Sequence, residues 1–334
     1  MPPSYVRRVV ESELRSRLQS TGAVVIEGPK ACGKTATAET LAASEVRLDV
    51  DDQARRAAEI EPALVLAGKT PRLIDEWQAV PSIWNHVRRA VDARGKPGQF
   101  ILTGSAVPSD DITRHTGAGR LSRVRMRPMT LFESGVGKGS ASLTAILDGT
   151  FSRASDPGLT IVQLAELVAL GGWPGNLGKT PAATLASVRD YIEEIRRTDI
   201  SRVDGVRRDP GRIGRLLRSL ARNESTYVSA ATLAADTGPE DLAIRDDTVR
   251  DYLDTLERLM ILENQPAWAP HLRSRSRLRL GPKRRFVDPS LAVACLRATP
   301  ERILADMEWF GFLFESLVVR DLRVFAQAVD GEVF

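Results

Sequence analysis

Apolar and polar residues along the first part of the chain form short runs that predict strands and helices in turn. Ala23–Glu27 is apolar and β-branched, as expected for a strand covered on both faces of a parallel sheet. Ala-rich or periodic stretches between such runs predict helices. The predicted strands are Ala23–Glu27, Glu45–Val50, Arg72–Trp77, Gln99–Ser105 and Leu121–Glu133. This alternation predicts an α/β fold class with a parallel sheet.

Helical periodicity dominates the rest of the chain, after a Gly-, Ser- and Ala-rich stretch at Gly135–Gly158 that predicts a linker. The predicted helices are Ser4–Gln19, Thr35–Ala43, Ser82–Arg94, Thr160–Leu170, Ala182–Thr198, Pro210–Arg222, Ser229–Asp236, Thr248–Ile261 and Leu304–Ala328. Trp173 lies in a tight turn, where an indole packs more often than it binds a ligand. The predicted domains are 1–134 (sheet core), 135–158 (linker), 159–208 (helical), 209–290 (winged-helix-like) and 291–334 (C-terminal helix).

The loop GPKACGKT, Gly28–Thr35, follows the first strand and opens a helix, which is the setting of a phosphate-binding loop. Its glycines let backbone N–H groups face a bound anion. Lys34 is placed to reach the β- and γ-phosphates of a nucleotide, and the Thr35 hydroxyl to bind Mg²⁺. Cys32 is interpreted as a small filler rather than a reactive thiol. The predicted nucleotide contacts are Gly28, Pro29, Lys30, Ala31, Cys32, Gly33, Lys34, Thr35 and Ala36.

Two carboxylates end the strand RLIDEW, at the edge of a parallel sheet where ligands collect. Asp75 is predicted to hold Mg²⁺ through water. Glu76 is predicted to act as the base that activates the water attacking the γ-phosphate. The alternative is a strand that ends in two acids at a surface turn.

Hydroxyls end the next strand, where Thr103 or Ser105 is placed to bond the γ-phosphate or the attacking water. A Gly-rich loop then precedes Arg120, with Arg114 just before the loop. Either arginine suits the role of a cation that stabilises the transition state, because a guanidinium binds phosphate oxygens in a fixed geometry. Structural pairing of either one is the alternative.

Composition excludes several classes of protein. The 334 residues are 43% hydrophobic and 27% charged, which suits two or three packed domains. No apolar run approaches the length of a membrane span, and the N-terminal stretch lacks the pattern of a secretory signal. We therefore expect a cytoplasmic protein that does not bind a membrane. The two cysteines, Cys32 and Cys295, offer neither a disulfide framework nor a zinc site, which leaves Mg²⁺ as the expected metal.

Positive charge is concentrated in one segment, Gln265–Val287, which holds seven Arg and Lys residues and no acid. Since the net charge is +4, the remainder sums to −3. These residues are Arg273, Arg275, Arg277, Arg279, Lys283, Arg284 and Arg285. The arginines spaced by two share one face of a strand, as in a wing that grips DNA. The alternative is a winged helix that contacts its own nucleotide-binding domain.

Several motifs occur together in an order that resembles a widespread bacterial and archaeal family of AAA-superfamily ATPases. They are GPKACGKT, LIDEWQ with VPSIW, ILTGS, GAGR, PMTLFE, GGWP, FVDPSLA and GFLFESLVVRDL. The resemblance implies a five-stranded AAA-type core followed by a winged helix. It also implies ATP-binding roles for Lys34, Thr35, Asp75 and Glu76, and sensor and finger roles for Thr103 and Arg120.

The same resemblance places the start of a restriction-endonuclease-like domain at the C-terminus, with Glu315 at its first acidic position. The later acid and lysine of that site have no counterpart in this sequence, so we expect no nuclease activity from this polypeptide. We predict an ATPase that couples Mg-ATP hydrolysis to conformational change on DNA or a protein partner, with a homo-oligomer as a further expectation. A P-loop small-molecule kinase and a non-hydrolysing nucleotide switch remain the alternatives.

Overall fold

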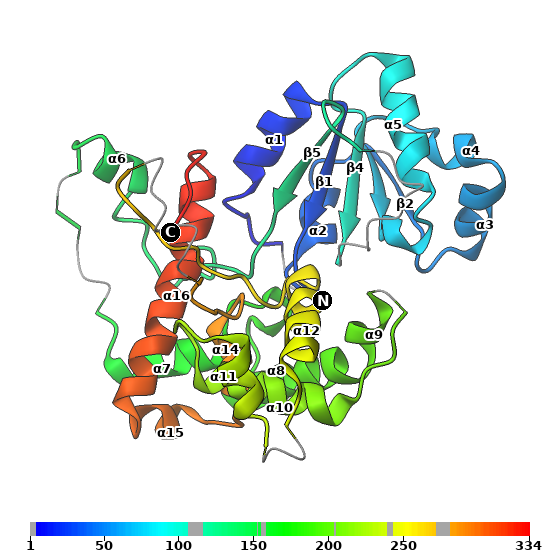
Figure 1. The fold of residues 1–334 in the computed structure, drawn as a ribbon. Coiled ribbons are helices and arrows are strands. Elements are labelled where there is room, and N and C mark those ends of the chain that lie inside the picture. The colour runs from blue at the N-terminus through cyan, green and yellow to red at the C-terminus, as the bar shows by residue number, and fades with distance from the viewer. Residues whose placement is uncertain are drawn as a thin grey trace. The chain divides into compact units, whose positions relative to one another are not determined.

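A computed structural model describes residues 5–105, 116–151, 153–154, 158–203, 205–238, 243–271 and 281–334. The chain divides into two compact units, Met1–Arg127 and Pro128–Phe334 (Figure 1). The sequence placed PMTLFE at the end of the first domain, whereas the structure groups it with the second unit. The Met129 N–H donates to the carbonyl oxygen of Gly172 at 2.6 Å, which ties this segment to that unit.

The first unit is built on a parallel five-stranded sheet in the order β2-β3-β4-β1-β5 (Figure 1). Ala23 of β1 is in register with Phe100 of β4 and Leu121 of β5. The carboxyl ends of these strands therefore meet at one edge, and the loop after β1 lies where the strand order reverses. The prediction of a parallel five-stranded α/β core is confirmed. The strands are β1 (Ala23–Glu27), β2 (Ser44–Arg47), β3 (Arg72–Asp75), β4 (Phe100–Gly104) and β5 (Leu121–Arg125).

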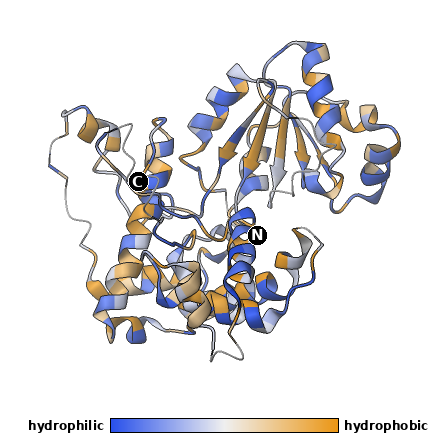
Figure 2. Cartoon of the chain, in the orientation of Figure 1, coloured by the Kyte–Doolittle hydropathy of each residue, from blue (hydrophilic) through white to orange (hydrophobic). Residues whose placement is uncertain are grey.

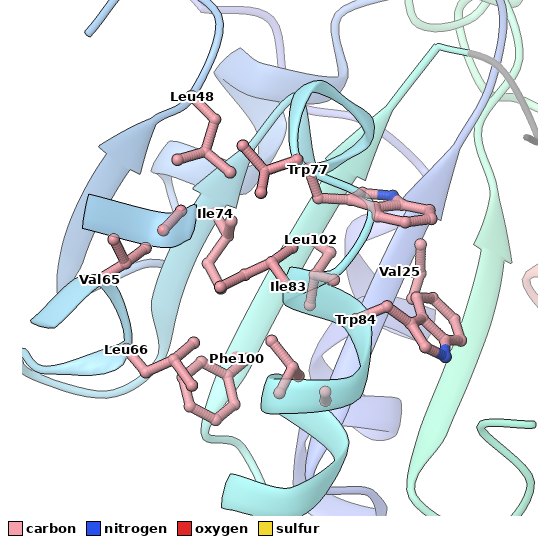
Figure 3. Close-up of a cluster of buried hydrophobic side chains, with 14 of the residues drawn as sticks. Val25, Leu48, Val65, Leu66, Ile74, Trp77, Ile83, Trp84, Phe100 and Leu102 are labelled. Carbon is pink, nitrogen blue, oxygen red and sulfur yellow. The ribbon is translucent and has the colours of Figure 1, made fainter. Parts of the chain in front are cut away.

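The inner strands β1, β3 and β4 are largely buried, which explains why they are mostly apolar, whereas the edge strands β2 and β5 are partly exposed and carry polar residues (Figure 2). Val25 and Ala23 of β1 point into one cluster, which includes Trp77 and Trp84 with ring centroids 5.1 Å apart (Figure 3). Val24 and other strand residues point into the opposite cluster. The helices of this unit are α1 (Glu11–Ser20), α2 (Lys34–Glu39), α3 (Asp52–Ile60), α4 (Pro62–Leu66), the 3-10 turn Trp77–Ala79 and α5 (Ile83–Arg94).

The second unit is helical in its described residues. Its centre is α14 (Pro289–Cys295), all seven residues of which are buried against α7, α8 and α10. Asp288 caps this helix by accepting a hydrogen bond from the Ser290 N–H. The other elements are α6 (Leu143–Leu147), α7 (Ile161–Leu170), the 3-10 turn Pro174–Asn176, α8 (Pro181–Glu194), the π-helical turn Ile195–Asp199, α9 (Ile200–Arg202), α10 (Pro210–Arg222), α11 (Ala230–Ala235), α12 (Asp246–Arg258), α15 (Pro300–Leu304) and α16 (Met307–Gln327).

Four elements differ from the sequence prediction. The first helix begins at Glu11 rather than Ser4, because the Arg8 N–H donates to the Glu11 carboxylate instead of forming a helical bond. The second strand ends at Arg47 rather than Val50, where a turn closed by the Asp51 N–H and the Arg47 carbonyl begins. The fifth strand ends at Arg125 rather than Glu133, because after one more bond, from the Met126 N–H to the Glu27 carbonyl, the chain leaves the sheet. The predicted linker contains the short helix α6, capped by the Ser142 hydroxyl.

Isolated antiparallel bridges lie next to the helices α10, α11 and α12. Thr226, between α10 and α11, pairs with Arg284, and two residues that follow α12, Leu262 and Gln265, pair with Phe286 and Lys283. The segment between Gln265 and Lys283 holds most of the predicted wing, and residues 272–280 lie outside the described part of the chain. The winged-helix assignment stays a prediction.

Candidate functional site

The loop Gly28–Thr35 connects β1 to α2 at the carboxyl edge of the sheet. Two of its residues have left-handed backbone conformations, Ala31 with φ 61° and Gly33 with φ 101°. Gly28 is required for a different reason: a Cβ there would lie 2.2 Å from the carbonyl oxygen of Met126. The loop can therefore adopt this tight path only with glycine at position 28.

Lys34 is almost fully buried, with 6% of its surface exposed. Its Nζ donates to the carbonyl oxygens of Gly28 at 2.9 Å and Pro29 at 2.8 Å, so the ammonium group lies over the loop. Cys32 is completely buried, and its Sγ lies 3.8 Å from the Met126 carbonyl oxygen. This position fits the interpretation of Cys32 as a packed filler. The predicted contacts Lys30 and Ala36 belong to the same loop and to the first turn of α2.

Asp75, at the end of β3, joins the loop to the neighbouring strand. Its Oδ1 accepts a hydrogen bond from the Thr35 hydroxyl at 2.9 Å and a second, shorter one from the Thr103 hydroxyl of β4. Asp75 is 5% exposed and Thr103 is fully buried. The structure therefore brings together Thr35, Asp75 and Thr103. The sequence predicts a Thr103 hydroxyl that faces phosphate or water, whereas in the structure this hydroxyl donates to Asp75.

Glu76 follows Asp75 in a left-handed conformation, with φ 51°, and directly precedes the 3-10 turn Trp77–Ala79. Burial raises the pKa of the Glu76 carboxyl above its ordinary value. The nearby charge of Lys34 opposes this rise, and that of Asp75 adds to it. A partly buried carboxylate with a raised pKa, next to a phosphate-binding loop, has the character of a general base.

Gln78 and Ser105 hold the Glu76 carboxylate. The Gln78 amide donates to Glu76 Oε2 in a short hydrogen bond, and the Ser105 hydroxyl lies 3.5 Å from the same oxygen. Sequence reasoning named Ser105 only as an alternative to Thr103 and did not name Gln78. The signal that was missed is a glutamine two residues after the acid. Gly104 leaves room for it, because a Cβ there would lie 2.5 Å from Gln78 Oε1.

Arg120 is not near the loop of its own chain. It precedes Leu121, which is in register with Ala23 at the amino end of β1, so it lies on the opposite edge of the sheet. The five residues of β1 put roughly 13 Å between these edges. The guanidinium pairs with Asp92 of α5 at 2.8 Å. Arg120 therefore lies away from the phosphate-binding loop of its own chain, and its role as a finger stays a prediction. Arg114 lies outside the described residues.

Three cations of the basic segment have carboxylate partners in their own unit. Arg285 is 1% exposed and pairs with Glu315, and the Lys283 Nζ lies 2.7 Å from the same carboxylate. The Arg284 Nη1 lies 3.5 Å from Glu257 Oε1. The predicted role of these three residues in nucleic-acid binding stays a prediction. The other four, Arg273, Arg275, Arg277 and Arg279, lie outside the described residues.

The acid of the resembling nuclease site, Glu315, is thus engaged in two ion pairs. Hydrogen bonds from Lys283 and Arg285 lower the pKa of its carboxyl against the effect of burial, which is the largest contribution and acts in the opposite direction. Within the described ranges, no group of three or more His, Cys, Asp or Glu side chains is arranged to hold a metal ion. Trp173 packs as predicted, with its ring centroid 4.8 Å from that of Tyr191.

In the part of the chain that the structure describes, none of the helices combines the length and hydrophobicity needed to cross a bilayer.

Comparison with known proteins adds to this geometry. Residues 20–134 match a family model described as an AAA domain, and residues 161–302 match a domain of unknown function, DUF8612. The chain is 26% identical over 322 residues to the uncharacterized proteins Rv2008c of Mycobacterium tuberculosis and Mb2031c of Mycobacterium bovis. The match covers 93% of this chain and 65% of each relative, so the chain spans about two thirds of their length.

A solved structure is similar in fold. The Walker-type ATPase PABY2304 of Pyrococcus abyssi superposes with a TM-score of 0.55 at 14% identity, over 87% of this chain and 96% of that protein. At this identity the likeness concerns the fold alone. The sheet, the loop geometry and the family model therefore agree that residues 20–134 contain a P-loop domain of the AAA type.

Proposed function

We propose that this chain binds ATP together with Mg²⁺ and hydrolyses it to ADP and phosphate. The observation that carries the proposal is the shared oxygen of Asp75, which links Thr35 of the phosphate-binding loop to Thr103 of β4. Glu76, with its raised pKa, is the next residue along the chain. A binding loop, a metal-type carboxylate and a base thus lie at one edge of the sheet, as phosphoryl transfer to water requires.

The donor set suits magnesium. Thr35 Oγ1 and Asp75 Oδ1 lie 2.9 Å apart, and both are the hard oxygen donors that Mg²⁺ prefers. Mg²⁺ keeps several waters and needs few protein ligands, so the absence of a larger acidic cluster among the described residues does not argue against it. When bound, the ion supplies positive charge against the phosphates.

Each remaining group has a part in the reaction. Lys34 donates from a buried ammonium that now bonds two loop carbonyls and would exchange these for phosphate oxygens. Glu76 accepts a proton from the attacking water, while Gln78 and Ser105 fix the direction of its carboxylate. Thr103 fixes the carboxylate of Asp75 by donating a hydrogen bond to its Oδ1.

Two substitutions separate binding from chemistry. We expect Lys34→Ala to abolish binding of a fluorescent ATP analogue, because it removes the buried loop cation. We expect Glu76→Gln to bind normally and to lose on the order of 10² to 10⁴ in kcat. Lys69→Ala, a change at an exposed lysine of the same unit, is the control. An unchanged kcat in Glu76→Gln would exclude this residue as the base, and lack of ATP binding by the wild type would refute the whole proposal.

For Arg120 we propose a role on a neighbouring chain, since it lies far from its own loop. Its exposed pair with Asp92 is weak and can be exchanged for a phosphate partner. Activity per chain should then rise with protein concentration. Mixing inactive Arg120→Ala and Lys34→Ala chains should restore some turnover, and turnover independent of concentration would rule out the role.

We also propose that ATP turnover is coupled to duplex DNA, which the arginines Arg273, Arg275, Arg277 and Arg279 contact through phosphates. Their spacing by two and the absence of acids among them support this proposal. If all four reach phosphates, log K against log salt should have a slope of about −3.6.

A fluorescence-anisotropy titration tests the DNA proposal. Changing Arg275 and Arg277 to Ala should reduce the steepness of this slope by roughly 2. Arg250→Ala, a change at an exposed arginine of α12, should leave the slope unchanged. DNA should also alter the ATPase rate of the wild type. If the double variant binds as well as the wild type, the segment contacts its own chain or a protein partner instead.

A further inference from the structure

Arg8 connects two parts of the first unit that are far apart in sequence. It precedes α1 and is buried, with 4% of its surface exposed. One guanidinium nitrogen donates to the Cys32 carbonyl of the phosphate-binding loop at 2.7 Å, and the other donates to the Arg127 carbonyl at 2.8 Å. Arg127 is the last residue of the first unit, directly before the second unit begins at Pro128. A single rigid, planar group therefore bonds both the loop and the junction.

The loop touches the same junction through contacts that do not involve Arg8. Gly28 lies so close to Met126 that an added Cβ would be 2.2 Å from its carbonyl oxygen. Cys32 Sγ lies 3.8 Å from that oxygen, and the Met126 N–H donates to the carbonyl of Glu27, which precedes the loop. The first and middle parts of the loop thus contact Met126, the residue before Arg127.

The segment that carries Arg8 is itself anchored to the helix that follows the loop. Buried Glu11 accepts hydrogen bonds from the Arg8 N–H at 2.9 Å and from the Tyr5 hydroxyl at 2.8 Å. That hydroxyl lies 3.2 Å from Thr37 Oγ1 of α2. The backbone of Arg8 is therefore fixed by Glu11. Because the guanidinium bonds both carbonyls, it cannot move with the Cys32 carbonyl without also changing its bond to Arg127.

We propose that Arg8 is a positioning residue that couples the conformation of the phosphate-binding loop to the junction between the two units. The inference rests on the proposed function, because the event that moves the loop is ATP binding. A displacement of the Cys32 carbonyl must either carry the guanidinium with it or break a charge-assisted hydrogen bond in a buried site. Since the same guanidinium bonds Arg127, the first response passes the displacement to the junction.

Three variants separate the geometry of Arg8 from its charge. Arg8→Lys keeps the charge but loses the planar fork that spans two carbonyls, and Arg8→Met keeps an unbranched apolar stem without the charge or the fork. Arg7→Met is the matched control, because Arg7 is the adjacent arginine and its side chain is 86% exposed. Circular dichroism establishes that each variant is folded. Should Arg8→Met fail to fold, Arg8→Lys alone decides the proposal.

Hydrogen exchange read by mass spectrometry measures the coupling, with and without a saturating non-hydrolysable ATP analogue. In the wild type and in Arg7→Met, the analogue should slow exchange both in the loop 28–35 and at Met126 and Arg127. In Arg8→Lys it should still slow exchange in the loop and at Met126, which the loop contacts without Arg8, but should leave the Arg127 amide unchanged. Loss of one charged hydrogen bond should also weaken analogue binding about tenfold, measured by fluorescence titration.

Three results would overturn the inference. In the first, Arg8→Lys retains the full analogue-dependent slowing at Arg127. In the second, Arg7→Met loses this slowing as well. In the third, the wild type binds the analogue with no change at the Arg127 amide, which removes the coupling and leaves the proposed ATP binding intact. A wild type that does not bind the analogue refutes the proposed function and the coupling with it.

Discussion

Glu224 is a completely buried acid in the second unit, and its ionisation should make the stability of that unit depend on pH. It is 1% exposed, just beyond the end of α10. Burial raises the pKa of its carboxyl from 4.5 to about 7, although hydrogen bonds from the Ser316 hydroxyl and the Phe286 N–H act in the opposite direction. The charge of Arg285 also opposes the rise, and that of Asp288 adds to it.

The sign follows from the two pKa values. Between pH 4.5 and 7 the unfolded chain has lost a proton that the folded chain retains, so raising the pH favours unfolding. The stability that the protonated Glu224 contributes is fully present below pH 4.5 and is lost as the pH rises through 7. At 1.36 kcal/mol for each pKa unit, the loss is about 3 kcal/mol in total, most of it between pH 5 and 7.

The perturbation is Glu224→Gln, which keeps the shape and does not titrate. Urea unfolding, followed by tryptophan fluorescence and circular dichroism at several values between pH 5 and 8, gives the free energy of unfolding for both proteins. As the pH rises from 5 to 8, the free energy of unfolding of the variant should increase by about 2 to 3 kcal/mol relative to that of the wild type. Glu308→Gln, at an exposed position of α16, controls for the substitution. A difference between Glu224→Gln and wild type that does not change with pH would refute the reasoning.

Three further outcomes are expected. Gln78→Met removes a hydrogen-bond donor from the Glu76 carboxylate, so the pKa of Glu76 should rise further and the acidic limb of kcat should move to higher pH in steady-state assays. Gly28→Ala should abolish nucleotide binding in a fluorescence titration because of the 2.2 Å contact, whereas Gly311→Ala, with open space in α16, should raise the melting temperature by stabilising the helix by about 1 kcal/mol. Arg320→Met should cost about 3 to 5 kcal/mol in urea unfolding, since it leaves a buried aspartate partner uncompensated, and a loss below 1 kcal/mol would contradict this.

The sequence alone determined the P-loop domain because its information is local. The loop Gly28–Thr35, the apolar strands beside it and the acids Asp75 and Glu76 are each encoded in a few contiguous residues, and parallel strands bring their carboxyl ends together by geometry. The same rule places Thr103 at this edge of the sheet, but only the structure shows that its hydroxyl donates to Asp75.

Tertiary structure decided which charges meet, because the partners of a long side chain are set by distant segments. Arg285 is a cation in a basic segment, which predicts phosphate binding. In the structure, however, its side chain is buried and paired with Glu315. Arg120 follows a Gly-rich loop, yet the register of β5 places it at the edge of the sheet away from that loop. Arg8 and Arg7 are indistinguishable by type and neighbourhood, and only the packing of α1 buries one and exposes the other. A guanidinium costs free energy to bury unless acceptors surround it, and the folded chain alone assembles those acceptors, here the carbonyls of Cys32 and Arg127.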